Sequence, residues 1–431
     1  MKETIRPVEK RLSEKSESAL FHGTARKIVL SIMKRLKKGR IHILDNDLKR
    51  TFGQMTDDTP LEASVTVLHP GFYHRIVFGG SVGSGEAFMM GLWRTDDLTV
   101  LIRIILLNQD VFEGMDRRWT RLSAPAYKIF HALRMDTKKG SRANISAHYD
   151  LGNDFYKLFL DETLTYSCGL FENESSTMKE ASLAKYDRIC KKLALKGSDH
   201  VLEIGTGWGG FALFAAAHYG CRVTTTTISK EQYSLAQERI EEAGLKDRIH
   251  ILFKDYRDLK DRFDKLVSIE MIEGVGHHYL ETFFRTCSSC LREDGMMMLQ
   301  AITITDRVYE RHKNTVDFIK RYIFPGSCIP SIAAMSHAVA RGTDLKIDHL
   351  EDITPHYTMT LRAWRSRLFE NIEQVKALGF SDAFIRMWEY YLCYCEAGFQ
   401  ERYLGDIQMR LIKPMCRPET LLPHLGGEKR P

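Results

Sequence analysis

Four glycines at close spacing follow a short apolar stretch near the middle of the chain. The apolar stretch, residues 201–204, carries an acid at Glu203 and is followed by an apolar helix that begins near residue 211. The glycines are Gly205, Gly207, Gly209 and Gly210. Glycine lets a backbone turn sharply and leaves amide groups open at a helix N-terminus, where a ligand approaches without meeting side chains. These residues predict a ligand-binding loop between a strand and a helix.

The residues around this loop distinguish between its ligands. Three of the glycines satisfy the fingerprint of a dinucleotide-binding turn, which is a weak signal when it stands alone. A dinucleotide site also expects an acid about 20 residues further on, but this chain has threonines at 224–227, followed by ISKEQ. Glu203 gives the spacing E-x-G-x-G-x-G, which is typical of S-adenosylmethionine (SAM) methyltransferases. We therefore favour SAM; a turn that only packs a helix on a strand is the alternative.

Strands and helices alternate around the glycine loop, as a parallel α/β sheet requires. Strands are expected at 222–228, 249–253, 265–269 and 295–304, and helices at 231–243 and 279–291. Ligands of open α/β sheets bind beyond the carboxyl ends of the strands. This rule gathers several polar residues around one crevice: Thr227, Asp255, Tyr256, residues 270–273 and residues 300–302. The expected fold is α/β, a Rossmann-like class I SAM methyltransferase domain with a smaller N-terminal mixed α+β domain.

The chain divides into four parts. Residues 1–115 predict the N-terminal domain, for which binding of acyl chains is one hypothesis, residues 116–143 a basic linker, residues 144–425 the methyltransferase domain and residues 426–431 a tail. Within the N-terminal domain we expect an amphipathic helix and three strands, then a glycine loop before further apolar helices. These elements are placed at residues 25–38, at 40–44, 61–68 and 71–78, and at 79–85.

Composition excludes several classes of protein. With 431 residues, 44% hydrophobic and 27% charged, the chain is of ordinary globular type. No apolar run reaches the roughly 20 residues that span a bilayer, and the first residues lack the apolar core of a signal peptide. Nine scattered cysteines are interpreted as reduced thiols, and no metal site is expected at the single CxxC of Cys287 and Cys290. We expect a cytoplasmic protein, peripheral to the inner face of the membrane.

The net charge of +6 is spread unevenly. Residues 117–142 hold eight Lys and Arg and one acid, Asp136. Composition alone favours a solvated linker, and anionic phospholipid or nucleic acid are the alternative partners. A nucleic-acid methyltransferase is disfavoured because the chain lacks the Asn/Asp-Pro-Pro-Tyr/Phe motif that holds a flipped base.

Several blocks together resemble the cyclopropane-fatty-acyl-phospholipid synthases and the related mycolic acid cyclopropane synthases. The blocks are HYDLGNDFYKLFLDETLTYSCGLF (148–171), LEIGTGWGG (202–210), TTISKEQ (226–232), EMIEGVG (270–276), YIFPGSCIPS (322–331), PHYTMTLRAW (355–364) and YLCYCEAGF (391–399). They span the catalytic region in order, and the added N-terminal domain is similar to that of the phospholipid synthases. The resemblance implies that a cis double bond of an unsaturated phospholipid acyl chain takes the methyl group of SAM, and that the resulting carbocation loses a proton as a cyclopropane ring closes.

In this family a bound bicarbonate ion is the base. The resemblance implies that Cys168, Glu273, the backbone of Ile302 and Tyr357 hold it in this chain. Without the resemblance, Glu273 is equally interpreted as a carboxylate at the N-terminus of helix 279–291. Many family members have a histidine where this chain has Gln300, and glutamine donates a hydrogen bond to an anion but does not shuttle a proton. This departure leaves open a methyl-branched (10-methyl) or methylene product, and a non-catalytic lipid-binding protein is the rival from another class.

The same resemblance assigns the remaining site residues. It implies a SAM pocket made of Tyr166, Ser167, Glu203, Gly205, Gly207, Gly209, Thr227, Gln232, Asp255 and Tyr256. We expect Tyr149, Tyr322 and Phe324 to line the substrate channel. Cys395 stands where the family often has an active-site thiol, but a nucleophile beside a carbocation would trap it, so packing is the favoured role. A homodimer is one option for assembly.

Overall fold

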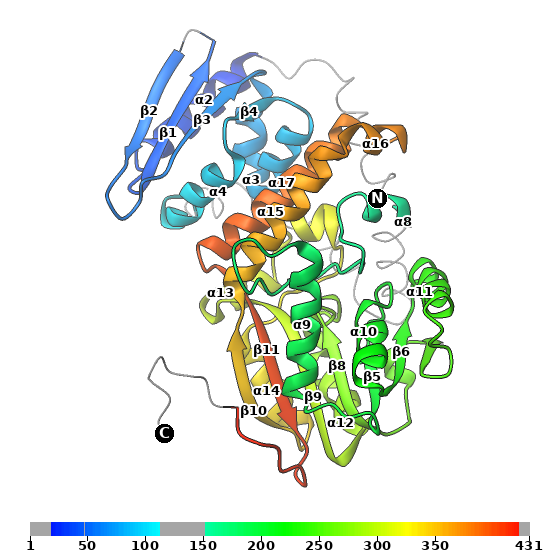
Figure 1. The fold of residues 1–431 in the computed structure, drawn as a ribbon. Coiled ribbons are helices and arrows are strands. Elements are labelled where there is room, and N and C mark those ends of the chain that lie inside the picture. The colour runs from blue at the N-terminus through cyan, green and yellow to red at the C-terminus, as the bar shows by residue number, and fades with distance from the viewer. Residues whose placement is uncertain (1–18, 47, 113–150, 422–431) are drawn as a thin grey trace, which may run out of the picture.

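The structure is a computed structural model that describes residues 19–46, 48–112 and 151–421. Figure 1 shows two regions joined by long helices: a small sheet with its helices at one end and a large mixed sheet at the other. The predictions for Tyr149, for the basic segment 117–142 and for the C-terminal tail lie outside the described residues. None of the helices in these ranges combines the length and apolar character that crossing a bilayer needs.

The large sheet has seven strands in the order β10-β11-β9-β8-β5-β6-β7. Strands β5 to β9 pair in parallel, whereas β11 pairs antiparallel with both β9 and β10. The bounds are β5 His200–Ile204, β6 Arg222–Thr227, β7 Ile249–Phe253, β8 Phe263–Ile269, β9 Leu291–Ile304, β10 Lys346–Asp352 and β11 Leu404–Ile412. The strand order reverses at β5, which has β6 on one side and β8 on the other. Such a reversal opens a crevice at the carboxyl end of the strand, where the glycine loop follows β5.

Alternating side chains of the strands build two apolar layers, because successive residues of a strand point to opposite faces. On β9, Met296 and Met298 face one core, and Met297 and Leu299 face the other. The first core holds α9 Met178–Lys192, α10 Gly210–Tyr219 and α11 Lys230–Glu242, and the second holds α12 Leu280–Ser289 and α14 Ile332–Gly342. Side-chain caps fix the starts of α9, α11 and α14, with a capping box of Thr177 and Glu180 on α9. The predicted strands and helices of this region are confirmed to within a few residues.

The N-terminal region forms a four-stranded sheet of order β2-β1-β3-β4 covered by helices. Its elements are α2 Ala19–Met33, β1 Gly39–Asp45, β2 Leu48–Gln54, β3 Glu62–Val67, α3 Gly71–Met89, β4 Trp93–Thr95 and α4 Leu98–Leu107. The predicted strand at 71–78 and glycine loop at 79–85 are wrong, because both stretches belong to α3, which kinks at Gly80 with a φ of +54°. Gly85 serves close packing, since a Cβ there would lie 2.3 Å from the Phe318 ring.

Two long helices connect the regions, α15 Thr354–Glu370 and α17 Asp382–Gln400, with α16 Ile372–Ala377 between them (Figure 1). α17 packs against α3, α4 and α15, and one apolar core runs through both regions. Polar contacts reinforce it: Thr99 donates to Glu396 at 3.1 Å and Arg103 donates to Glu401 at 2.6 Å. Shorter elements complete the chain: α8 Asn153–Lys157, η2 Tyr256–Asp258, η3 Ile272–Gly274, η4 His277–Tyr279, α13 Asp306–Lys313 and η5 Ile319–Ile323.

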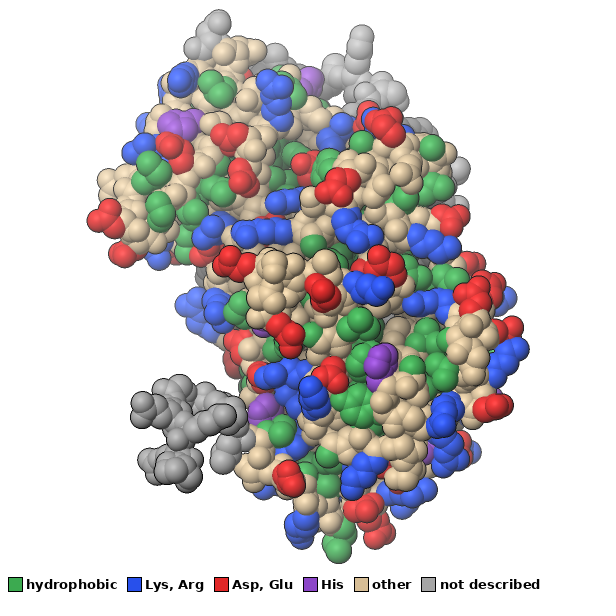
Figure 2. Space-filling view, viewed as in Figure 1, with side chains coloured by type: hydrophobic (Ala, Val, Ile, Leu, Met, Phe, Trp, Pro, Cys, Tyr) green, Lys and Arg blue, Asp and Glu red, His purple; other side chains and the backbone are tan. Residues whose placement is uncertain are grey.

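Charged side chains of both signs are interspersed over the face shown in Figure 2, without a continuous region of one sign. This mixture agrees with the small net charge of the chain. The described surface on this face therefore offers no extended basic track for a nucleic-acid backbone.

Candidate active site

A cavity of about 1300 Å³ begins at the glycine loop and extends between the two regions of the molecule. Its first part lies beyond the carboxyl ends of β5, β6 and β8, as the strand order requires. Its second part is walled by aromatic and aliphatic side chains of α17, β9 and the N-terminal region: Val82, Ile102, Ile105, Leu106, Ile302, Phe324, Tyr391, Phe399 and Leu404. The cavity thus joins a polar pocket to an apolar chamber.

The glycine loop forms the polar end of the cavity. Gly205 and Gly207 line it with φ values of +102° and +53°, which other residues rarely adopt. Gly209 also has a positive φ, of 85°, but it caps α10 and is not among the lining residues. Gly210 opens the helix so close to Tyr186 that a Cβ would lie 2.5 Å from the hydroxyl. The loop therefore combines backbone turns with space for a ligand beside the helix N-terminus.

Glu203 lines the same end of the cavity and is almost fully buried. Burial raises the pKa of its carboxyl to about 8, although a hydrogen bond from Thr225 acts in the opposite direction. Its Oε2 atom has no hydrogen-bond partner within the described chain. A buried acceptor without a partner fits a ligand that brings its own donors, such as the amino group of SAM.

Four further residues of the predicted SAM pocket line the cavity: Thr227, Gln232, Asp255 and Tyr256. Thr227 donates to the side chain of Gln232 at 3.0 Å. Asp255 is ion-paired with Arg257 at 2.7 Å, and the ring of Tyr256 packs edge-on against Phe283. Their contacts with the cofactor stay predictions, but the structure brings all four residues to the side of the glycine loop where β6 and β7 end.

The apolar end holds only part of the predicted channel. Phe324 lines the cavity, and the hydroxyls of Tyr166 and Tyr391 lie 2.9 Å apart within its wall. Tyr322 is not a lining residue: it is buried, and its hydroxyl donates to Glu86 of α3 at 2.6 Å. The channel prediction for Tyr322 is therefore wrong, because the hydroxyl is used to join the two regions.

Neither of the two cysteines of the predicted site, Cys168 and Cys395, is a reactive thiol. The Cys168 thiol is fully buried and is not among the lining residues, and it donates to the carbonyl oxygen of Gly169 at 3.2 Å. Burial raises the pKa of this thiol well above its usual value. Cys395 lines the chamber, and burial raises its thiol pKa too. Protonated thiols are poor nucleophiles, which favours packing for Cys395.

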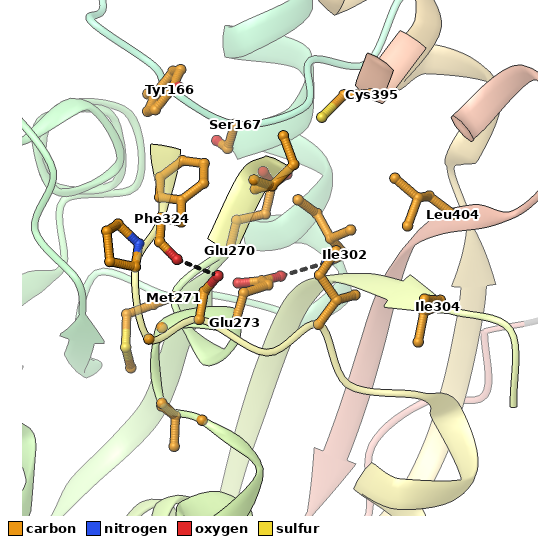
Figure 3. A pocket seen from close by; sticks show the side chains of 18 of the residues that line it. Tyr166, Ser167, Glu270, Met271, Glu273, Ile302, Ile304, Phe324, Cys395 and Leu404 are labelled. Carbon is orange, nitrogen blue, oxygen red and sulfur yellow. Dashed lines mark hydrogen bonds between the residues drawn. The ribbon is translucent and has the colours of Figure 1, made fainter. Parts of the chain in front are cut away.

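Two carboxylates meet where the polar pocket opens into the chamber. Figure 3 shows Glu270 and Glu273 side by side, with Ser167 and Tyr166 above them and Ile302 opposite. The backbone N–H of Ile302 donates to Glu273 Oε1 at 2.6 Å, so these two members of the predicted cluster bond directly to each other. Burial raises the pKa of Glu273 to about 8, with a further contribution from the charge of Glu270. Its Oε2 has no partner among the residues that the structure describes.

Glu270 is the acceptor for the other predicted donors. The backbone N–H of Cys168 donates to its Oε1 at 2.8 Å, and the Tyr357 hydroxyl donates to its Oε2 at 2.6 Å. The Gln300 amide nitrogen donates to Oε1 at 2.8 Å. Sequence reasoning placed Glu270 in the crevice but gave it no role. The available signal was an acid directly after β8, together with glutamine in place of histidine at position 300.

Further buried polar groups surround this pair, and no motif identified them. Lys185 of α9 is fully buried and donates to Ser167 Oγ at 2.5 Å. Burial lowers the pKa of Lys185, while the charge of Glu270 acts to raise it. Asp406 of β11 accepts from the Gln300 amide at 3.2 Å, and burial raises its pKa well above the usual range.

Comparison with known proteins identifies this arrangement. The family model described as mycolic acid cyclopropane synthetase matches residues 136–409. The chain belongs to this family. It is 36% identical over 346 residues to the tuberculostearic acid methyltransferase UfaA1 of Mycobacterium tuberculosis, which covers 79% of this chain and 80% of that protein. It is 34% identical to the cyclopropane-fatty-acyl-phospholipid synthase of Escherichia coli K12 over 80% of this chain and 86% of that one.

Solved structures agree with the family. The mycolic acid cyclopropane synthase CmaA1 in complex with SAH and CTAB superposes with a TM-score of 0.59 at 32% identity, covering 63% of this chain and 98% of that one. The predicted class I SAM methyltransferase fold is confirmed, and the chain is a SAM-dependent methyltransferase. A non-catalytic lipid-binding protein is set aside accordingly. The pocket fits SAM, because the glycine loop leaves room beside α10 and Glu203 has an unpaired acceptor.

Proposed function

We propose that this family member transfers the methyl group of SAM to the cis double bond of an unsaturated acyl chain in a membrane phospholipid, and that the product is a cyclopropane ring. The cavity carries this proposal, because it connects a SAM-sized polar pocket to an apolar chamber. A double bond is an uncharged, weak nucleophile that needs an electrophile held in a dry site. The phospholipid substrate and the ring are the parts of the proposal that await an experiment.

The reaction balances as one methyl transfer and one proton loss. SAM supplies an electrophilic methyl group, and its carbon–sulfur bond breaks with both electrons left on sulfur. The π electrons of the double bond form the new carbon–carbon bond, which leaves a positive charge on the neighbouring carbon of the chain. Loss of a proton from the transferred methyl provides the electrons that close the ring. The chain must hold the substrate, exclude water and accept that proton.

Aromatic side chains suit the charge that develops in the chamber. Tyr166, Tyr391 and Phe399 line it, and the electron-rich faces of such rings attract cations. They offer no strong nucleophile, and the thiol of Cys395 stays protonated because burial raises its pKa. The chamber thus favours loss of a proton over capture of the cation.

A second product is favoured by two specific observations. The chain resembles a protein named tuberculostearic acid methyltransferase at 36% identity, and it carries Gln300 where many relatives have a histidine. The alternative is the same methyl transfer followed by loss of a proton without ring closure, which gives a methylene-branched chain. A methyl-branched (10-methyl) chain then requires a separate hydride donor, such as a reduced nicotinamide, and a proton to reduce that double bond. Proton NMR of the isolated lipid separates the products, because cyclopropane methylene protons resonate far upfield of other acyl protons.

We further propose that the enzyme meets its substrate at the inner, cytoplasmic face of the membrane without crossing it. The basic segment 117–142 is the proposed contact with anionic headgroups, and it lies outside the described residues. A homodimer stays a prediction, as do the domain boundaries at residues 115 and 143.

Mass spectrometry tests the proposal. Purified protein is incubated with SAM and vesicles of a phospholipid with cis-monounsaturated chains, and the lipids are extracted. We expect acyl chains heavier by one CH2 unit, and none with vesicles of saturated chains. If SAM binds but unsaturated chains keep their mass, the proposed substrate is wrong.

A further inference from the structure

Glu270 occupies the place that the family resemblance assigns to a bicarbonate ion. The resemblance names Cys168, Glu273, the backbone of Ile302 and Tyr357 as the groups that hold that ion, and the donors that these residues offer in the structure are the backbone amides of Cys168 and Ile302 and the hydroxyl of Tyr357. The first and the third donate to Glu270, at 2.8 and 2.6 Å, and the second donates to Glu273 at 2.6 Å. Every one of these donors therefore already has a carboxylate of the chain as its acceptor.

The described residues do not fit a free bicarbonate at this place. A second anion would have to share donors that Glu270 already uses and would lie beside its negative charge. Two anions at contact distance in a buried site repel strongly, so one of them has to take up a proton or leave. Gln300 does not relieve this conflict, because its amide nitrogen also donates to Glu270, at 2.8 Å.

The backbone directs Glu270 into the site. Glu270 follows the last residue of β8 with a φ of +46°, a left-handed conformation that is uncommon for residues other than glycine. This conformation is strained for a residue with a side chain and persists only where the surroundings enforce it. Here the Glu270 N–H donates to the carbonyl oxygen of Gln300 on β9 at 2.8 Å, and the carboxylate is held by its donors. The side chain lines the cavity as a result.

We propose that Glu270 replaces the bicarbonate ion: its carboxylate is the built-in anion that accepts the proton from the transferred methyl group. This inference rests on the proposed function. The C–H electron pair closes the ring, and the proton bonds to Oε2, which accepts one hydrogen bond from Tyr357 and has a lone pair to spare. After the products leave, the proton passes to water and the carboxylate is restored.

The surrounding charges keep one negative charge on the pair of carboxyls. Burial raises the pKa of Glu270 above its ordinary value, and Lys185 and the donors from Tyr357, Cys168 and Gln300 limit this rise. Glu273 has one backbone donor and a pKa of about 8, so it holds a proton at neutral pH. Coupled acids of this kind titrate as a pair, and hydrogen bonds to the charged form favour ionisation of Glu270, which has three donors.

Gln300 is locked into the orientation that this role needs. The amide nitrogen of Gln408 donates to Gln300 Oε1 at 3.1 Å, and Lys192 donates to Gln408 Oε1 at 2.8 Å. The oxygen of Gln300 is thereby occupied, and its nitrogen faces Glu270. A glutamine here stabilises the ionised form of Glu270 without competing for the proton.

The test compares activity in carbon dioxide-free buffer with and without added bicarbonate, and measures binding of 13C-bicarbonate by NMR. We expect the wild type to be equally active in both buffers and to bind no labelled ion. Glu270→Gln should lose about 100-fold in rate, as loss of a general base does, and bicarbonate should not restore it because the amide still fills the site. Glu270→Gly vacates the donors, so this variant should bind labelled bicarbonate and recover rate when it is added.

The controls separate failure of this inference from failure of the proposed function. Glu238→Gln, on an exposed position of α11, should behave as the wild type, and SAM binding by each variant verifies that it is folded. A wild type that needs bicarbonate, or a Glu270→Gln variant of full activity, overturns the inference while leaving methyl transfer intact. Absence of methylated lipid from the wild type in both buffers refutes the proposed function itself. If Glu270→Gly does not fold, the wild type and Glu270→Gln still decide the question.

Discussion

Replacing Tyr357 by phenylalanine isolates the effect of one hydrogen bond on the proposed base. The Tyr357 hydroxyl donates to Glu270 Oε2 at 2.6 Å, and its ring stacks on Phe399 with centroids 4.2 Å apart and planes 10° apart. Phenylalanine preserves this stack. Its direct effect on Glu270 is that Oε2 loses the hydrogen bond from the hydroxyl. We therefore expect Tyr357→Phe to fold normally and to keep its affinity for SAM.

The size of the expected change in rate follows from the charge of the acceptor, the Glu270 carboxylate. A hydrogen bond to a charged group contributes about 1.5–3 kcal/mol, and each pKa unit corresponds to about 1.4 kcal/mol. Loss of the hydroxyl should raise the pKa of Glu270 by about 1 to 2 units. Less of the carboxylate is then ionised at a given pH, so the rate falls by about 10- to 100-fold below the new pKa and recovers above it.

The assay is the initial rate of lipid methylation as a function of pH, with SAM binding measured in parallel. The acid limb of kcat/KM should move to higher pH in Tyr357→Phe. Among the residues that the structure describes, five other titratable groups interact with Glu270 and are unchanged in this variant: Lys185, Glu273, Asp406, Cys168 and Tyr391. A profile that drops at all pH values without moving, or an equal loss of SAM affinity, would refute the reasoning.

Three further predictions concern the second carboxyl, the loop and the fold. Glu273 holds a proton in this scheme, so Glu273→Gln should lower the rate far less than Glu270→Gln and leave SAM affinity nearly intact, as measured by lipid mass spectrometry and a SAM titration; a loss of rate as large as that of Glu270→Gln would make Glu273 the base. Gly210→Ala places a Cβ 2.5 Å from the Tyr186 hydroxyl, and overpacking of this kind should cost about 1–3 kcal/mol in urea unfolding, whereas an unchanged midpoint contradicts it. Burial raises the pKa of Glu351, but hydrogen bonds from Arg188 and Lys192 outweigh it and lower the pKa to about 2. Because this folded value lies below the ordinary 4.5, the stabilisation is present above pH 4.5 and is lost as the pH falls towards 2. Glu351→Gln should therefore cost about 1 kcal/mol at pH 7 and less with each step down in pH, and a penalty independent of pH counts against the ion pairs.

Local patterns were sufficient to predict the catalytic region of the fold. The strand that carries Glu203, the glycines after it and the alternation of strands and helices are all short-range signals, and the structure follows them. The N-terminal region was harder because glycines lower helix propensity, which made 79–85 resemble a turn. Packing explains the glycines of this helix: Gly83 and Gly85 lie against Arg75 and Phe318, where a side chain would not fit.

The sequence indicated several residues of the candidate site but not the hydrogen bonds between them. Glu273 and the backbone of Ile302 were both expected to hold an anion, whereas in the structure the Ile302 amide donates to Glu273 itself. The role of Glu270 depends on a left-handed backbone turn, which the letters EMIEG do not reveal. Lys185 and Asp406 come from α9 and β11, and only the sheet order brings them to the carboxylates. Tyr322 illustrates the opposite error, since its aromatic type suited a channel while its hydroxyl binds Glu86.

Part of the chamber wall comes from α3 and α4, which supply Val82, Ile102 and Leu106. A methyltransferase region without its N-terminal partner would expose the apolar side of α17 and admit bulk solvent beside the reacting chain. Hydroxide or water would then add to the cation before any ring closed, and the lipid would emerge as an alcohol. In the proposed reaction the N-terminal region of this chain therefore helps to keep water away from the cation, although the residues proposed to handle the methyl group and the proton lie elsewhere.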